Sequence, residues 1–122
     1  MMDKSMAMNL LKNTFVDYTL IDGTTVKLTL AFALLKMLED KDANLANRYY
    51  KVTSKKESEM RELDIVTMLY TAYFCACIAD GAEAMDEDTF MILLGSDRLS
   101  LKRIFNQLMG AKKNPASVSH SL

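Results

Sequence analysis

The feature that most constrains this sequence is an apolar run of fifteen residues from Ile65 to Ala79, which only Thr67 and Thr71 interrupt. A helix that is apolar almost all round needs cover on every side, either from a protein core or from lipid. A helix needs about 20 apolar residues to cross the hydrocarbon core of a bilayer. We therefore predict that the run is the buried central helix of a bundle and that the protein does not enter a membrane.

Alternation of apolar and polar residues predicts a β-hairpin ahead of that helix. The alternation covers residues 14–20 and 25–30, which is the period of half-buried strands. Asp22-Gly23 stands between the two segments, and this pair favours a tight turn because the turn needs positive φ. A hairpin alone is marginally stable, so we expect its apolar face to pack on helices.

Apolar residues at helical spacing predict the remaining elements. These patterns cover 31–38, 45–52, 57–79, 87–94 and 97–109. Ser54 and Glu57 form a possible capping box at the start of the central helix, and Asp86 and Ser96 are the expected N-caps of the last two helices. We expect Gly110 to end the last helix.

Together these patterns predict a mainly α (α+β) fold, with an N-terminal β-hairpin packed on a bundle of about four to five helices. Half the residues are hydrophobic and a quarter are charged, which suits one globular domain, here 13–111. Residues 1–12 show no clear period, so we expect a flexible arm. Residues 112–122 are polar and Ser-rich, so we expect a disordered tail.

The sequence offers no set of residues for catalysis, a cofactor or a metal ion. His120 is the only histidine and lies in the predicted tail, where nothing would hold a general base in place. Cys75 and Cys77 would point to nearly opposite sides of a helix, so they cannot pair, and further Cys or His ligands are lacking. We expect a protein that is not an enzyme, with two reduced cysteines in its core.

Charges are distributed unevenly along the chain. Residues 80–88 hold five acids and no base, whereas five bases and no acid follow Asp97. Either helix dipoles or attraction of a partner explains this arrangement. Three of the bases, Arg98, Lys102 and Arg103, raise nucleic-acid binding as an alternative. The net charge of −1 favours a solvated charged face instead, so we expect no nucleic-acid partner.

The ten methionines point to contact with other proteins, because this side chain adapts to varied surfaces. We expect Met37, Met60 and Met68 to fill gaps in the core. The arm and the last helix carry apolar residues that could dock a partner, although the clean amphipathic period of the last helix favours a place in the core for its stripe. The candidate contact residues are Met6, Met8, Leu10, Leu11, Leu101, Phe105, Leu108 and Met109.

The order of these elements carries a family resemblance. The hairpin TLIDGTTVKLTL leads into AFALLKMLED, followed by MLYTAYFCA, DEDTFMILLGSD and FNQLMGAKKN. This order resembles the tail assembly chaperones of long-tailed, siphovirus-type phages of Gram-positive bacteria, over about residues 14–113. Its motifs are apolar and turn patterns without a catalytic signature.

The resemblance implies a non-enzymatic function in building the phage tail. Such chaperones bind the tape measure protein, keep it soluble, and leave as tail-tube protein subunits assemble around it. They form homo-oligomers, and many phages also make a frameshifted longer form. They work in the host cell cytoplasm and are absent from the mature virion. A small nucleic-acid-associated regulatory protein and a generic oligomeric scaffold protein remain the alternatives.

Overall fold

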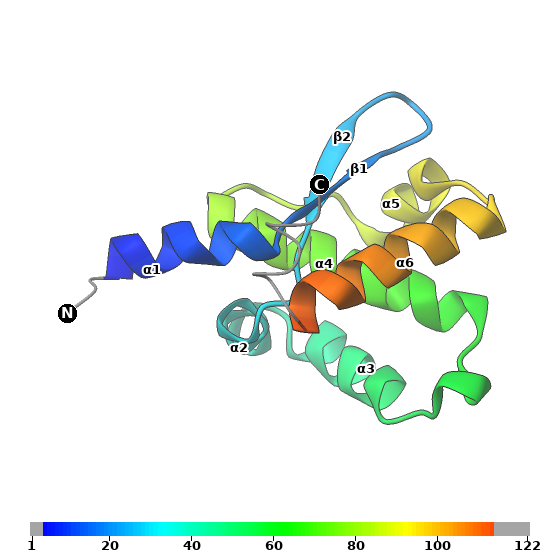
Figure 1. The fold of residues 1–122 in the computed structure, drawn as a ribbon, viewed down its shortest axis with the longest axis horizontal. Coiled ribbons are helices and arrows are strands. Elements are labelled where there is room, and N and C mark those ends of the chain that lie inside the picture. Colours follow the sequence, from blue (N-terminus) through cyan, green and yellow to red (C-terminus); the bar gives the residue numbers. More distant parts are fainter. Residues whose placement is uncertain (1–3, 114–122) are drawn as a thin grey trace.

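A computed structural model describes residues 4–113, with side chains described from Met6 to Ala111. The protein is mainly helical with an N-terminal antiparallel hairpin, which confirms the predicted fold class (Figure 1). In chain order the elements are α1 (Lys4–Leu11), the 3-10 helix η1 (Lys12–Thr14), β1 (Val16–Thr19), β2 (Thr25–Leu28), α2 (Phe32–Lys41), α3 (Ala43–Thr53), the 3-10 helix η2 (Glu57–Glu59), α4 (Glu62–Asp80), α5 (Glu87–Leu94) and α6 (Arg98–Lys113).

The hairpin forms where the alternating pattern predicts it. Val16 lies opposite Leu28 in the antiparallel register. At the turn, Gly23 has a φ of 89°, and the Asp22 carboxylate accepts a hydrogen bond of 3.0 Å from the Thr24 N–H. The strands are shorter than predicted because Thr14 belongs to η1, where its hydroxyl lies 2.6 Å from that of Thr29.

Helix α4 is the centre of the fold, as the apolar run predicts. β2, α2, α3, α5 and α6 all contact it. The Thr29 N–H donates a hydrogen bond of 3.1 Å to the Ala72 carbonyl, which joins the end of the hairpin to the helix. With 19 residues, α4 is long and apolar enough to cross a membrane, but 56% of the relevant window is buried inside the protein. Its cover comes from the surrounding elements, so burial supports the core assignment better than length does.

Two groups of helices flank α4. α2 and α3 pack on each other and on α4, while α6 packs on α4, β1 and η1. In Figure 1, α6 crosses in front of α4, and α2 and α3 lie below them. Helix α4 is therefore the element on which both α6 and the α2–α3 pair pack.

The N-terminal segment corrects one prediction. Residues 4–11 form α1, where the sequence predicted an arm without regular structure. Met8 and Leu11 pack against the core and supply tertiary contacts that so short a helix needs. The helical period of this segment could not be recognised in the sequence, because the exposed residues Met6 and Leu10 are as apolar as the packed ones. Residues 1–3 of the predicted arm lie outside the described residues.

The start of the central helix also differs from the prediction. Glu57 belongs to η2, and α4 begins at Glu62. The Ser54 hydroxyl donates to the Lys51 carbonyl, so Ser54 closes α3 and does not cap the next helix. Asp64 takes the capping role, because its carboxylate accepts a hydrogen bond of 2.9 Å from the Arg61 N–H.

At the C-terminal end, one predicted cap is confirmed and one is corrected. Asp86 caps α5 by accepting a 3.1 Å hydrogen bond from the Thr89 N–H. Asp97, and not Ser96, caps α6, since its carboxylate accepts from the N–H of Leu99. Helix α6 continues through Gly110 to Lys113, so residues 112 and 113 of the predicted tail are helical. The rest of that tail, including His120, lies outside the described residues.

Candidate protein-binding groove

An open groove runs over α4 between α6 and the α2–α3 pair. It consists of two adjoining hollows of about 430 and 460 Å³ that share Thr53 and Met109. Methionine and aromatic side chains make up most of its apolar lining. The apolar lining residues, which we call the groove residues, are Phe32, Leu35, Tyr49, Tyr50, Met60, Met68, Phe105 and Met109.

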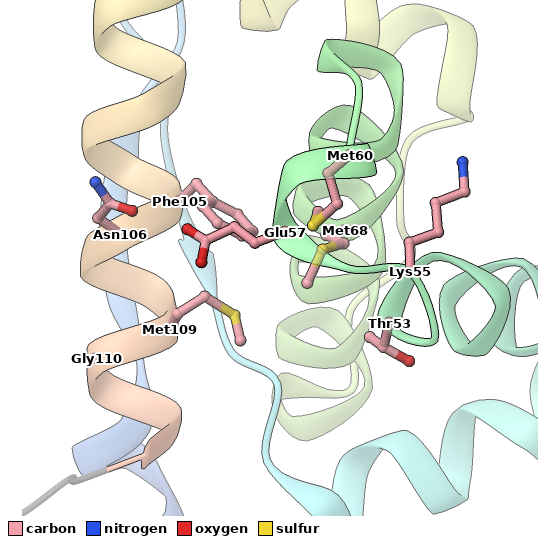
Figure 2. Close-up of a pocket in the computed structure, with 9 residues that line it drawn as sticks. All are labelled: Thr53, Lys55, Glu57, Met60, Met68, Phe105, Asn106, Met109 and Gly110. Atoms are coloured by element: carbon pink, nitrogen blue, oxygen red, sulfur yellow. The ribbon is translucent and has the colours of Figure 1, made fainter.

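Helix α6 forms one wall. Phe105 and Met109 are one turn apart and share a face of the helix. Both are half-buried, and Figure 2 shows them pointing from α6 towards Met60 and Met68. The neighbouring positions Ile104 and Leu108 are buried and fix the helix to the core. The stripe on α6 is thus divided between core and groove.

The opposite wall is the segment from Lys55 to Met60, which immediately precedes α4 in the chain. Its anchor is Asp64, only 8% exposed, which accepts from the Arg61 N–H and from Lys55 Nζ, each at 2.9 Å. The hydrogen bond from the Arg61 backbone, followed by the one from Lys55, lowers the pKa of the Asp64 carboxyl. A charged cap therefore holds Met60 at the edge of the groove.

Tyrosines shape the end of the groove between α2 and α3. Tyr49 is buried, and its ring meets that of Tyr50 edge to face, with centroids 5.5 Å apart. Burial raises the pKa of Tyr49 to about 12. The Tyr50 hydroxyl donates a 2.9 Å hydrogen bond to Glu39, which orients a ring that is 41% exposed. This end therefore presents a positioned aromatic surface.

Phe32 is the most exposed groove residue, at 79%. The apolar helical pattern predicted over residues 31–38 includes Phe32 and would place it on the buried face, and the structure corrects this. Phe32 is the first residue of α2. The residues that this helix buries, Leu34, Leu35 and Leu38, all follow it in the chain. A large exposed aromatic ring at the rim of an apolar groove is typical of a binding surface.

Charged side chains form the rim of the groove, and both signs are present. Lys36 and Lys55 stand beside Glu39 and Glu57. Lys55 is engaged by Asp64, and Glu39 accepts from Tyr50. An apolar floor with a rim of mixed charge resembles a protein–protein interface, whereas a nucleic-acid site needs a cluster of bases.

The structure separates the eight predicted contact residues into three groups. Phe105 and Met109 line the groove. Leu101 and Leu108 are buried in the core, so they are not part of a surface in the single chain, which corrects that part of the prediction. On α1, Met6 and Leu10 are exposed, whereas Met8 and Leu11 are partly buried against the body.

Sequence reasoning missed most groove residues. It assigned Met60 and Met68 to core gaps, and Met68 is indeed buried, but both line the groove. Helical periodicity shows which residues share a face, but it does not show where two neighbouring helices leave a gap. The unusual number of methionines was the available signal.

Other chemistry finds little support in the described part of the chain. Between Met6 and Ala111, no three His, Cys, Asp or Glu side chains gather where they could hold a metal ion. The Cys75 thiol is buried, and the Cys77 thiol is half-buried. No protein-family model, curated protein or solved structure matches the chain.

Proposed function

We propose that this protein is a phage tail assembly chaperone that binds apolar helical segments of the tape measure protein in its groove. It acts without catalysis in the host cell cytoplasm and is absent from the mature virion. The observation that carries the proposal is the open groove lined by methionine and aromatic side chains. The family resemblance supplies the identity of the client.

The groove has the properties that a helical client requires. An amphipathic helix binds a protein by laying residues at i, i+3, i+4 and i+7 into an apolar groove. Met109 points from α6 across the opening towards Met68 and Met60, and unbranched thioether side chains can adapt to different client residues (Figure 2). Tolerance of this kind suits a long client whose successive segments differ in sequence.

Each contact in such a complex can be weak. Many chaperone copies along one client raise the effective concentration of every further contact, so the total affinity is high. Weak single contacts also allow release when tail-tube subunits displace the chaperone. The rim of mixed charge supports such release, because it can orient the client without a strong ion pair that would slow dissociation of the complex.

Co-expression with the tape measure protein of the same phage tests the proposal. We expect the client to become soluble and to co-purify with the wild-type chain. Phe32→Asp should reduce the amount of co-purified client at least about tenfold, because it places a charge at the apolar rim without disturbing the core. Ile21→Asp is the matched control, since this residue is 68% exposed in the hairpin turn and does not line the groove.

Two results would overturn the proposal in different ways. If the client stays insoluble and nothing co-purifies with the wild type, the protein is not its chaperone, and a generic scaffold is the better description. If Phe32→Asp binds the client as well as Ile21→Asp does, the chaperone uses another surface.

A further inference from the structure

Three methionines from different parts of the chain meet at one hollow of the groove. Met60 lies between η2 and α4, Met68 lies on α4 and Met109 on α6, and all three line the hollow of about 430 Å³ (Figure 2). Met60 and Met109 are half-buried, whereas Met68 is only 2% exposed. A small molecule dissolved in water therefore has access to two of the three thioethers without any change in the fold.

Methionine sulfur is the oxidisable group that this hollow offers. Its lining residues, all within the described part of the chain, include no cysteine. Cys75 is buried in the core, and Cys77 lines a different hollow together with Phe74. Burial also raises the pKa of the Cys77 thiol, which lowers the fraction of reactive thiolate. An oxidant that enters the groove therefore meets thioethers and no competing thiol.

Oxidation would make the lining of the groove polar. A sulfoxide replaces a flexible apolar side chain by a polar one, whose oxygen accepts hydrogen bonds. The Thr53 hydroxyl, which lines the hollow, already donates to the Tyr50 carbonyl at 3.0 Å. The Lys55 ammonium is likewise held by Asp64 at 2.9 Å. An apolar client helix would thus cover sulfoxide oxygens that lack donors, and burial of an unpaired polar group costs free energy.

We propose that the groove is redox-sensitive, and that oxidation of Met60 and Met109 by hydrogen peroxide prevents client binding. Because the site is the same groove, this regulation rests on the proposed function. In the reaction the O–O bond of the peroxide breaks and one oxygen bonds to the thioether sulfur, which is oxidised by two electrons, while the other oxygen leaves as water. A methionine sulfoxide reductase reverses the change: two thiols supply two electrons and become a disulfide, and the sulfoxide oxygen leaves as water.

Peroxide treatment of the folded chain tests the proposal, with a soluble amphipathic segment of the tape measure protein as the probe. Mass spectrometry of peptides locates the sulfoxides, and circular dichroism shows whether the oxidised chain stays folded. We expect oxidation of Met60 and Met109 to raise the dissociation constant of the probe at least about tenfold. Treatment with a methionine sulfoxide reductase and dithiothreitol should return it to the untreated value.

Two double variants show which methionines are responsible. Met60→Leu combined with Met109→Leu replaces the oxidisable sulfurs by apolar side chains of similar volume. Whatever its own affinity, this variant should bind the probe equally well before and after peroxide. Met6→Leu combined with Met91→Leu is the matched control, since these residues are 54% and 37% exposed and do not line the groove. It should lose binding after peroxide as the wild type does.

Failure of this regulation and failure of the proposed function give different results. If the untreated wild type does not bind the probe, the proposed function is wrong and the redox-sensitive groove fails with it. If the untreated chain binds and its affinity is unchanged once Met60 and Met109 are oxidised, the redox proposal alone is overturned. Sulfoxides confined to other methionines, unfolding of the oxidised chain, or an equal effect of peroxide on the groove double variant would also overturn it.

Discussion

Lys55 Nζ lies 2.9 Å from Asp64 Oδ2, and this ion pair ties the wall of the groove to the first turn of α4. The same carboxylate accepts the Arg61 N–H, so one side chain both caps the central helix and fixes the segment that carries Met60. Asp64 is mostly buried, so solvent screens these contacts less than it screens an ion pair on an open surface.

Replacing Asp64 should weaken the fold measurably. We expect Asp64→Ala to lower the free energy of unfolding by about 1–2 kcal/mol, because it removes a helix cap and leaves Lys55 without its partner. Asp17→Ala is the control, since its ion pair with Lys27 has the same 2.9 Å length but is exposed. Urea unfolding should show a loss below about 0.5 kcal/mol for the control. Equal losses for both variants would contradict this role of Asp64.

The contribution of Asp64 should depend on pH in the acid range. The Arg61 and Lys55 hydrogen bonds lower the pKa of this carboxyl from its ordinary value of 3.8. A lowered pKa in the folded state means that the stabilisation is present above that ordinary value and is lost as the pH falls through the folded-state value. The difference in unfolding free energy between wild type and Asp64→Ala should therefore shrink below about pH 4. If this difference in unfolding free energy stays constant as the pH is lowered further, the predicted pH dependence is wrong.

Two tyrosines should limit stability in alkali. Burial is the main cause that raises the pKa of Tyr49 and of Tyr70 to about 12, and the Tyr70 hydroxyl donates a 2.8 Å hydrogen bond to the Met85 carbonyl. Because the folded state favours the neutral phenols, their stabilisation is present below the ordinary pKa of 10.0 and is lost as the pH rises towards 12. Tyrosinate absorbance should show a late phase that coincides with unfolding. If all tyrosines ionise near pH 10 in the folded protein, the prediction is wrong.

Phe90 should be a main support of α5. It is fully buried, and its ring stacks on Tyr73 with centroids 5.0 Å apart. We expect Phe90→Ala to cost about 3–5 kcal/mol of unfolding free energy, because it leaves a cavity in the core. Ile92→Ala is the comparison on the same helix, where a residue 70% exposed should cost less than about 0.5 kcal/mol. Thermal or urea unfolding of both variants measures the contrast, and similar losses would contradict the packing described here.

The sequence predicted those parts of the fold that depend on local patterns. Alternation and Asp22-Gly23 predicted the hairpin, and the apolar run predicted α4 as the central helix. Helix α1 was missed because the contacts of Met8 with the body are tertiary and leave no periodic signal. The capping role of Asp64 was missed because Ser54, which lies nearby in the sequence, fits the same local pattern.

The groove could be predicted only in part, for a physical reason. Phe105 and Met109 belong to an apolar stripe that is visible in the sequence, and so does Leu108, which is fully buried. Which of them faces the core depends on how far α6 lies from α3, and this distance is set by packing across the whole domain. Phe32 shows the same limit, since its place at the start of α2 leaves it exposed.

Nuclear magnetic resonance of isotope-labelled methionine methyl groups tests the groove most directly. A soluble amphipathic segment of the tape measure protein would be titrated into the labelled chain. We predict that the methyl signals of Met60, Met68 and Met109 shift with the bound fraction, while that of Met91, which lies on α5 and does not line the groove, does not. A shift of Met91 with unchanged signals from the three groove methionines would show that the client binds elsewhere.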